Sequence, residues 1–265
     1  MSLDKWIGWF ASLRAMGAGM VRVAGGRWRR CAVCERRVIA FWPWRGGWAA
    51  APPAMRALRM VGSDLDHFAC PRCGANDRDR HLRLYLQRTG LSRQMTGARI
   101  LHFAPEAPLE AWLGSHALAT YVRADLFPAR DGIVRMAMES IDAPDASFDW
   151  VIANHVLEHV ADLPKCISEI ARVLAPGGRA ILQTPWCQGL ARTIEDETVT
   201  DPVARLHLYG QDDHVRLFGR DVCVQLSGQD LTATPLRHAD VLPDIDPAEW
   251  GVNPDESLML FERAR

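Results

Sequence analysis

Residues 147–160 read SFDWVIANHVLEHV, and this stretch decides the fold class. Its central part, residues 148–154, is short and almost entirely apolar, which is typical of a strand buried on both faces. A helix is predicted over residues 163–174, and the Pro-Gly-Gly turn at 176–178 ends it. Another strand follows at residues 179–184. Strand, helix and strand in this order predict a parallel βαβ unit.

Outward from this unit, predicted strands and helices alternate along most of the chain. Strands are expected over residues 99–104, 121–125, 134–136, 232–239 and 258–263, and helices over 76–89, 106–116 and 219–227. Such alternation predicts an α/β fold with a mostly parallel, doubly wound sheet and helices on both faces. In that architecture ligands bind at the carboxyl ends of the strands, where the strand order switches direction.

Residues 186–218 interrupt this alternation, because they fit neither the helical nor the strand period. The segment is too long for an ordinary connection, and such segments usually cover a site or bind substrate. Near its end, residues 207–221 (HLYGQDDHVRLFGRD) gather many ionisable groups around two glycines. We therefore expect a substrate-binding insertion here.

Three residues of this insertion are the catalytic candidates. Asp213, or its neighbour Asp212, can orient the imidazole of His214, and an acid-oriented imidazole is a common general base. Arg216 can hold an anionic group of a substrate, such as a carboxylate or phosphate. The alternative is structural: His214 and Arg216 would then join the insertion to the sheet by hydrogen bonds.

Charge is distributed unevenly along the 265 residues, although the net charge is only -1. Residues 1–94 contain 17 Lys and Arg against 6 Asp and Glu, whereas the remainder contains 14 against 26. A basic first third can meet a phosphate-bearing substrate, nucleic acid or an anionic membrane. It can equally dock on the acidic remainder of the same chain.

Four of the seven cysteines form two Cys-x-x-Cys pairs, Cys31 with Cys34 and Cys70 with Cys73. Two such turns supply the four thiolates of a tetrahedral zinc site. Zn²⁺ would be structural here, since four thiolates leave no open coordination position. A redox dithiol is the alternative, but neither pair lies near a βαβ unit. The single cysteines are expected to be small buried residues: Cys166, Cys187 and Cys223.

The first residues carry apolar side chains near helical spacing, interrupted by charges. No run approaches the ~20 apolar residues of a membrane-spanning helix, and no secretory signal pattern is present. We expect an amphipathic helix packed on a cytoplasmic protein, with a helix at a membrane interface as the alternative. The predicted organisation is a helix at 1–27, a zinc-binding module at 28–75, a linking helix at 76–96 and a large domain at 97–265 with the insertion 186–218.

Two motifs resemble a known superfamily. Residues 147–160 are similar to the fourth-strand motif of class I S-adenosylmethionine (SAM)-dependent methyltransferases, and residues 169–178 (EIARVLAPGG) to the helix and turn that follow it. Within this superfamily the chain resembles the methyltransferases of type 11, and the resemblance covers residues 97–265. It implies a Rossmann-like, seven-stranded sheet, SAM as cofactor and methyl transfer as the activity.

The chain also resembles a subgroup that begins with a cysteine knuckle. In this subgroup the first strand reads like residues 101–106 here (LHFAPE), and a stretch like residues 210–216 (GQDDHVR) occurs further on. The superfamily usually has an acidic residue and spaced glycines at the first strand, which let the backbone approach the methionine part of SAM. Here His102 stands at the acidic position and the glycines are absent.

The resemblance places SAM at the strand ends. Asp125 can accept hydrogen bonds from both ribose hydroxyls, with a simple loop cap as the alternative. Glu106 would bind the ammonium group, or is merely an acid favoured by the helix dipole. Ala137 stands where relatives often have an adenine-binding acid, so Met138 and Glu139 would take its place. The implied cofactor-binding residues are His102, Phe103, Ala104, Pro105, Glu106, Asp125, Leu126, Met138, Glu139, Asn154 and His155.

Three functions remain open. The favoured one is methyl transfer from SAM to an O or N atom of a small molecule, such as a sugar or secondary metabolite, because the insertion is rich in ionisable groups. The second is an RNA methyltransferase in which the basic zinc-binding module grips the nucleic acid. The third is a non-catalytic scaffold, suggested by the missing glycines.

Overall fold

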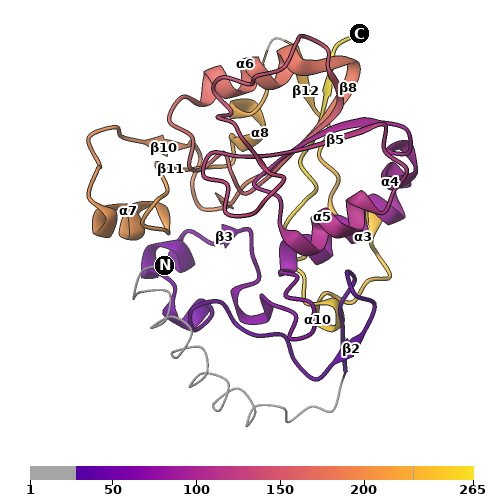
Figure 1. The fold of residues 1–265 in the computed structure, drawn as a ribbon. Helices are drawn as coiled ribbons and strands as arrows, with labels where there is room; N and C mark the ends of the chain where they lie inside the picture. Colours follow the sequence, from indigo (N-terminus) through magenta and orange to yellow (C-terminus); the bar gives the residue numbers. More distant parts are fainter. Residues whose placement is uncertain (1–27, 229) are drawn as a thin grey trace.

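The computed structural model describes residues 28–228 and 230–265, so the helix predicted over residues 1–27 lies outside the described residues. Seven strands form the central sheet in the order β12-β13-β8-β7-β4-β5-β6 (Figure 1). In chain order they are β4 (Arg99–Phe103), β5 (Thr120–Asp125), β6 (Val134–Arg135), β7 (Phe148–Asn154), β8 (Leu174–Gln183), β12 (Leu231–Ala233) and β13 (Leu260–Arg263). None of the described helices is long and apolar enough to span a bilayer.

Strand direction gives the sheet its switch point. The pairs β4·β5, β5·β6, β4·β7 and β7·β8 are parallel, and β13 is antiparallel to both of its neighbours. The chain builds outward from β4 to β6 and then returns to place β7 on the other side of β4. The order therefore reverses between β4 and β7, where ligands bind in open α/β sheets. The predicted fold class is confirmed.

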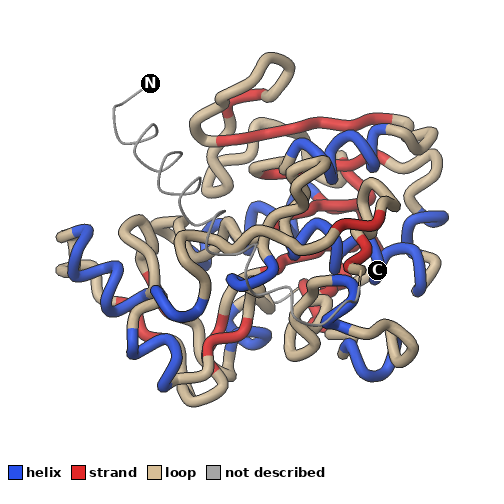
Figure 2. The backbone as a smooth tube through the Cα atoms, turned by 90° about the horizontal axis from the view of Figure 1, so that it is seen from below, coloured by secondary structure: helices blue, strands red, loops and turns tan. Residues whose placement is uncertain are grey.

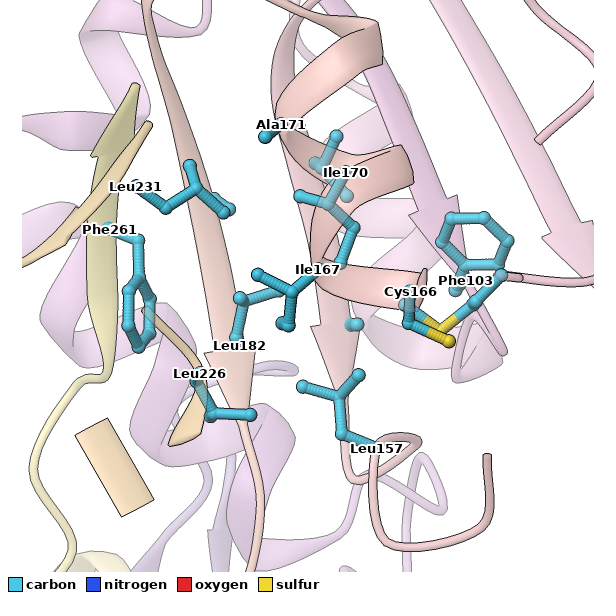
Figure 3. Packing of buried hydrophobic residues seen from close by; sticks show 14 of the residues in the cluster. Phe103, Leu157, Cys166, Ile167, Ile170, Ala171, Leu182, Leu226, Leu231 and Phe261 are labelled. Atoms are coloured by element: carbon cyan, nitrogen blue, oxygen red, sulfur yellow. The ribbon is translucent and has the colours of Figure 1, made fainter. Parts of the chain in front are cut away.

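Helices cover both faces of this sheet. On one face lie α3 (Asp77–Arg88), α4 (Leu91–Gln94) and α5 (Ala107–Gly114), and on the other α6 (Leu163–Val173) and α8 (Val222–Gln225). Figure 3 shows Ile167 and Ile170 of α6 packed toward Leu182 of β8. These apolar positions recur every three or four residues, so one stripe of α6 is buried on the sheet.

Element boundaries depart from the prediction in two strands. β8 begins at Leu174, five residues before the predicted start, because Gly177 (φ 74) and Gly178 allow the turn to lie inside the strand. A Cβ on Gly178 would lie 2.7 Å from the carbonyl oxygen of Ala175. β12 ends at Ala233, since the proline two residues later has no N–H to continue the ladder. The helix predicted over residues 219–227 is only four residues long, α8.

The N-terminal module is built mostly from loops, drawn in tan in Figure 2. Its elements are β1 (Arg29–Arg30), β2 (Arg37–Val38), η2 (Trp48–Ala50), α2 (Pro53–Ala57), β3 (Met60–Val61) and η3 (Leu65–His67). A pair of backbone hydrogen bonds between Trp42 and Ala69, of 2.8 and 2.9 Å, joins the two cysteine turns. Because so few of its residues are in long elements, the module depends on contacts with the rest of the chain.

The insertion pairs directly with this module. Its elements are β9 (Trp186–Cys187), β10 (Ile194–Glu195), α7 (Pro202–Tyr209) and β11 (Arg216–Leu217). β10 and β11 form an antiparallel hairpin, while β9 pairs with β3 of the module. Figure 1 shows α7, in orange, beside the indigo and purple chain of the module, and α7 contacts α2. The module and the insertion thus form one continuous wall below the sheet.

Arg80 of α3 joins the module to the C-terminal part of the chain. Its buried guanidinium donates hydrogen bonds to five backbone carbonyls, those of His67, Phe68, Ala75, Trp250 and Gly251. Trp250 ends α10 (Pro247–Trp250), the last of the helices. The five N–H donors of an arginine are thereby all used. Part of the basic charge of the first third therefore serves internal docking.

Candidate functional site

The four predicted cysteine ligands come together. Sγ of Cys31 lies 3.7 Å from Sγ of Cys73, and Sγ of Cys34 lies 4.0 Å from Sγ of Cys70. All four sulfurs lie within 4.8 Å of one another, and the thiols are free. Sulfurs bound tetrahedrally to Zn²⁺ at about 2.3 Å lie about 3.8 Å apart. The observed spacing fits a metal ion and is far longer than a disulfide bond.

Two turns hold these thiols. The β1–β2 hairpin brackets the first pair, with the backbone N–H of Cys31 bonded to the carbonyl of Arg36 at 3.0 Å. In the second turn Gly74 has φ 75, and its N–H bonds to the carbonyl of Cys70 at 2.9 Å. Burial raises the pKa of the Cys73 thiol to about 11. A bound cation reverses this effect, since metal ligation releases thiol protons.

The switch point of the sheet has two residues in an unusual backbone conformation. Ala104, directly after β4, has φ 46, and His155, directly after β7, has φ 56. Non-glycine residues at positive φ are uncommon and cluster at functional sites. These two turns lie at the same edge of the sheet, where Glu106, two residues after Ala104, accepts a hydrogen bond of 3.1 Å from Asn154, the last residue of β7.

A cluster of polar atoms surrounds this edge. Arg78 and Asp79, in the first turn of α3, lie near Glu106, with 3.9 Å between Arg78 Nη2 and Glu106 Oε1. Several buried atoms of the cluster have no hydrogen-bond partner within the described part of the chain: Arg78 Nε, Asp79 Oδ1, Glu106 Oε2, Asn154 Oδ1 and His102 Nε2. Buried polar atoms are normally paired, so this cluster is incomplete without a ligand.

The charge state of the cluster indicates what it lacks. Burial, followed by the charge of Glu106, raises the pKa of Asp79 well above its usual range. Burial also raises the pKa of Glu106, although the positive charge of Arg78 opposes this. A positively charged group bound beside these two carboxyls would lower both pKa values and favour the ionised forms.

His102 is the most buried member of this group. Its Nδ1 shares a hydrogen bond of 2.9 Å with the hydroxyl of Tyr121, and its Nε2 lies 4.0 Å from Glu106. Burial lowers the pKa of His102 to about 3, so the imidazole is neutral at pH 7. Its neighbour Phe103 packs in the core beside Cys166 of α6 (Figure 3), and Pro105 is also buried. These two residues shape the turn and do not offer polar atoms to a ligand.

Asp125 lies at the end of β5, as predicted. Its Oδ1 accepts a hydrogen bond of 2.8 Å from the backbone N–H of Phe127, which is the loop-cap arrangement. Oδ2 remains for another partner. Leu126 and Phe127 are 47% and 73% exposed, so an unusual apolar surface adjoins this carboxylate.

The structure does not bring the predicted adenine-binding residues to an open site. Met138 is a buried member of the core, and Oε1 of Glu139 accepts a hydrogen bond of 3.1 Å from the N–H of Ala161. The side chain of Met138 therefore packs in the core and does not line a cavity here. Apolar residues on alternate positions of this segment look alike in sequence, whether they face a ligand or the core.

A cavity of about 350 Å³, here called the chamber, opens beside the switch point. It lies between the module, the residues that follow β7, and the insertion. The module supplies an aromatic and apolar wall that includes Trp44, Met55, Met60, Leu65 and Phe68. The opposite wall is polar and includes Arg78, His155, Glu158, His159 and His214. Its volume and mixed lining are typical of small-molecule sites.

His214 presents one nitrogen to the chamber. Its Nδ1 lies 3.0 Å from the carbonyl oxygen of Tyr209, which only accepts, so Nδ1 carries the proton. Nε2 then holds the lone pair, and it has no hydrogen-bond partner among the residues described. Burial lowers the pKa of His214, which favours this neutral form. The ring of His159 stands edge-on to it, with ring centres 4.7 Å apart.

The other two catalytic candidates occupy different places from those expected. Asp213 pairs with His159, with 3.4 Å between a carboxylate oxygen and Nδ1. His214 is oriented by the backbone carbonyl of Tyr209 and not by Asp213. Arg216 is buried, and it donates to both carboxylate oxygens of Glu195 and to carbonyls of the 157–161 loop. Arg216 therefore fixes the loop that carries Glu158 and does not point at a substrate, as in the structural alternative.

Comparisons with known proteins show which part of the chain resembles methyltransferases. Residues 114–182 match the family model of the methyltransferase domain, and this segment contains β7, α6 and most of β8. The family resemblance is confirmed. A probable S-adenosylmethionine-dependent methyltransferase of Mycolicibacterium smegmatis is 38% identical over 71 residues, 27% of this chain and 25% of that protein. The uncharacterised methyltransferase YcgJ of Bacillus subtilis is 32% identical over 78 residues, 29% and 28% of the two chains.

These matches cover only part of the relatives. The chain spans about a quarter of the length of the curated methyltransferases it matches. Among solved structures is 1,6-didemethyltoxoflavin-N1-methyltransferase of Burkholderia thailandensis with bound 1,6-didemethyltoxoflavin and S-adenosylhomocysteine. It is 14% identical with a TM-score of 0.46, and the match covers 82% of this chain and 92% of that one. The segments outside residues 114–182, including both cysteine pairs and the insertion, lie beyond the family match.

Sequence reasoning missed three residues of the site. Arg78 and Asp79 belong to the run Asp-Arg-Asp-Arg at the start of α3, which resembles an ordinary solvated helix end. Glu158 lies in the decisive stretch, but nothing in a single sequence shows that it faces a cavity. One signal in the sequence could have identified Arg78 and Asp79. An apolar helix face begins directly after their charged run, and a helix that buries this face also brings its first turn toward the interior.

Proposed function

We propose that the chain is a SAM-dependent methyltransferase that acts on an O or N atom of a small molecule held in the chamber. The observation that carries this proposal is the incomplete polar cluster at the switch point of a sheet whose central segment matches the methyltransferase domain. The cluster offers one cation and two carboxyls, which is the complement of an amino-acid zwitterion. SAM ends in such a group.

In this proposal Arg78 holds the carboxylate of SAM through its guanidinium, whose Nε has no hydrogen-bond partner within the described residues. Glu106, assisted by Asp79, accepts the ammonium group, and the Asn154 amide completes the hydrogen bonds. Asp125 remains the proposed ribose-binding residue. When bound, SAM would supply a methyl group carried on a positively charged sulfur, and a lone pair of the acceptor would take this group.

The chain's own contribution is to position the acceptor and to exclude water from it. The aromatic wall of the module suits an apolar or planar acceptor body, and the polar wall suits its nucleophilic group. His214 remains the proposed general base, since its Nε2 can take the acceptor's proton. The alternative of an RNA substrate has less support, because Arg80 and Arg83 of the basic first third bond to backbone carbonyls of this chain.

The four cysteines are proposed to bind one structural Zn²⁺. Their spacing and the two turns fit tetrahedral ligation, and the ion would lock the loop-rich module that forms one wall of the chamber. In this proposal zinc acts on substrate binding only through the shape of that wall.

Calorimetric titration with S-adenosylhomocysteine tests the cofactor site. We expect saturable binding to the full chain, and Glu106→Gln should weaken it at least about tenfold, because one charge-assisted hydrogen bond to the ammonium group is lost. Glu197→Gln is the matched control, since Glu197 is exposed and lies in the insertion. Absence of binding to the folded wild-type chain would exclude the proposed activity.

A further inference from the structure

A second group of metal-ligand side chains lies in the chamber, apart from the four cysteines. One ligand atom from each of Glu158, His159 and His214 lies within 4.8 Å of the other two. All three residues line the chamber. The side chains of Glu158 and His214 are buried, whereas that of His159 is 33% exposed.

Both imidazoles are oriented through one nitrogen only. Nδ1 of His214 is bonded to the carbonyl of Tyr209, and Nδ1 of His159 lies 3.4 Å from a carboxylate oxygen of Asp213. Metal-binding histidines commonly have such an oxygen partner on the nitrogen that does not touch the metal. The remaining nitrogen of His214 is a buried lone pair that faces the chamber and finds no partner in residues 28–228 or 230–265.

The carboxylate is held just as firmly. Oε2 of Glu158 accepts a hydrogen bond of 2.9 Å from the hydroxyl of Thr184, and Oε1 lies 3.4 Å from Nδ1 of His155. Arg216 binds carbonyls of the 157–161 loop that carries Glu158 and His159. Two ligands on this fixed loop and one on the insertion therefore form a preorganised group, and such support is the usual surrounding of a metal site.

We propose that Glu158, His159 and His214 bind a divalent transition-metal ion such as Zn²⁺, Fe²⁺ or Co²⁺. Two imidazole nitrogens and one carboxylate oxygen are the donor set that these ions take in catalytic sites. Three protein ligands leave at least one coordination position open, and the chamber provides the space beside it. The four-cysteine site differs in this respect, since its thiolates fill a tetrahedral ion.

The class of acceptor follows, and this step rests on the proposed methyl transfer. An open position on such an ion binds an oxygen donor of the acceptor, and a coordinated hydroxyl loses its proton to solvent at a lower pH than a free one. In the metal-bound protein the ion occupies the lone pair of His214 Nε2, so this role replaces the general-base role that we propose for His214 in the metal-free chamber. The inference therefore narrows the acceptor to a hydroxyl-bearing molecule whose aromatic or apolar body fits the module wall.

A cobalt titration tests the metal site without any methyl transfer. The full chain, with zinc at its cysteines, is titrated with Co²⁺ and followed by calorimetry and visible absorption. We expect one further Co²⁺ per chain, with the weak bands of a nitrogen and oxygen site and without sulfur-to-cobalt charge transfer. His159→Gln and Glu158→Gln should each weaken this binding at least about tenfold, because each removes a ligand.

His207→Gln is the matched control, since His207 is an exposed histidine of α7 and lies outside the group. It should bind cobalt as the wild type does. Equal affinity of the wild type and both ligand variants would overturn the proposal, and so would cobalt bound only at the cysteines. Binding of S-adenosylhomocysteine is measured on the same samples without cobalt, so a failure of the cofactor site is seen separately from a failure of the metal site.

Discussion

Asp77, the first residue of α3, is a carboxyl that the fold prefers to keep protonated. Burial and then the charge of Glu256 raise its pKa to about 7, from 3.8 in a free peptide. A raised carboxyl pKa means that the folded chain holds this proton more tightly than the unfolded chain. The stability that Asp77 contributes is therefore fully present below about pH 4 and is lost as the pH rises through about 7.

Asp77→Asn removes this loss, because the amide cannot ionise and its oxygen can still accept the hydrogen bond from the N–H of Asp64. We expect the free energy of unfolding of the variant, relative to the wild type, to rise by up to about 4 kcal/mol between pH 4 and pH 8. Urea unfolding followed by circular dichroism at several pH values measures it. Asp131→Asn, at an exposed position, should show no such trend. A flat difference for Asp77→Asn would show that the carboxylate is stabilised in another way.

At the scale of single residues, the sequence predicts chemistry better than it predicts orientation. The cysteine ligands and the cluster members Glu106 and Asn154 are where their spacing places them. Met138 faces the core and Arg216 faces a loop, because both outcomes depend on which way one strand or hairpin turns. Such choices are made by packing partners far along the chain, and a single sequence does not display them.

At the scale of elements, the side chain of Arg80 connects α3 by hydrogen bonds to the second cysteine turn and to the C-terminal end of α10. Its guanidinium also stacks on Phe41, 3.7 Å from the ring centre. We expect Arg80→Met to lower the free energy of unfolding by roughly 3–5 kcal/mol, because five buried carbonyls lose their charged donor. Denaturant titration gives this value.

Arg80→Lys keeps the charge but has only three donors in a different geometry, so its loss should be smaller than that of Arg80→Met. Arg72→Met, at an exposed position between Cys70 and Cys73, is the control and should change little. If Arg80→Met were as stable as the wild type, the five hydrogen bonds would not hold the module in place.

Helices and strands with one clear hydrophobic period could be predicted from the sequence, whereas the pairing of short strands far apart in the chain could not. β7 has the predicted bounds, and α3 and α6 agree to within a residue at each end, because a buried strand or an amphipathic helix carries its own pattern. The pairing of β3 with β9 was not predictable. Each strand has two residues, and they are more than 120 positions apart. Loop closure over such a distance leaves no local signal.

At the scale of the whole molecule, the proposed Zn²⁺ should stabilise other parts of the chain as well as the module. The module contacts α3 through Arg80 and the insertion through β3, so its unfolding would remove one wall of the chamber. A ligand at 100 times its dissociation constant adds about 2.7 kcal/mol. We therefore expect chelation of zinc to lower the Tm by roughly 5–10 °C in calorimetry, because 1 kcal/mol shifts a domain of this size by about 2–4 °C.

The comparison is made with and without a strong chelator, and zinc added back in excess should restore the Tm. Cys73→Ser should behave like the chelated wild type and respond little to added zinc. Cys223→Ser is the control, because Cys223 lies outside the group of four cysteines. An unchanged Tm after complete removal of zinc would mean that the module is held by its contacts alone.

The pairing of β3 with β9 also has a consequence for biosynthesis. The aromatic wall of the chamber leaves the ribosome early, but the strand that closes it follows more than 120 residues later. Until then Met55 and Met60 lack the insertion residues that pack beside them in the folded chain, Cys187, Tyr209 and Leu217. A nascent chain is therefore open to misfolding while about 125 of its 265 residues are synthesised, and it should need chaperones for longer than a chain whose module closes on itself.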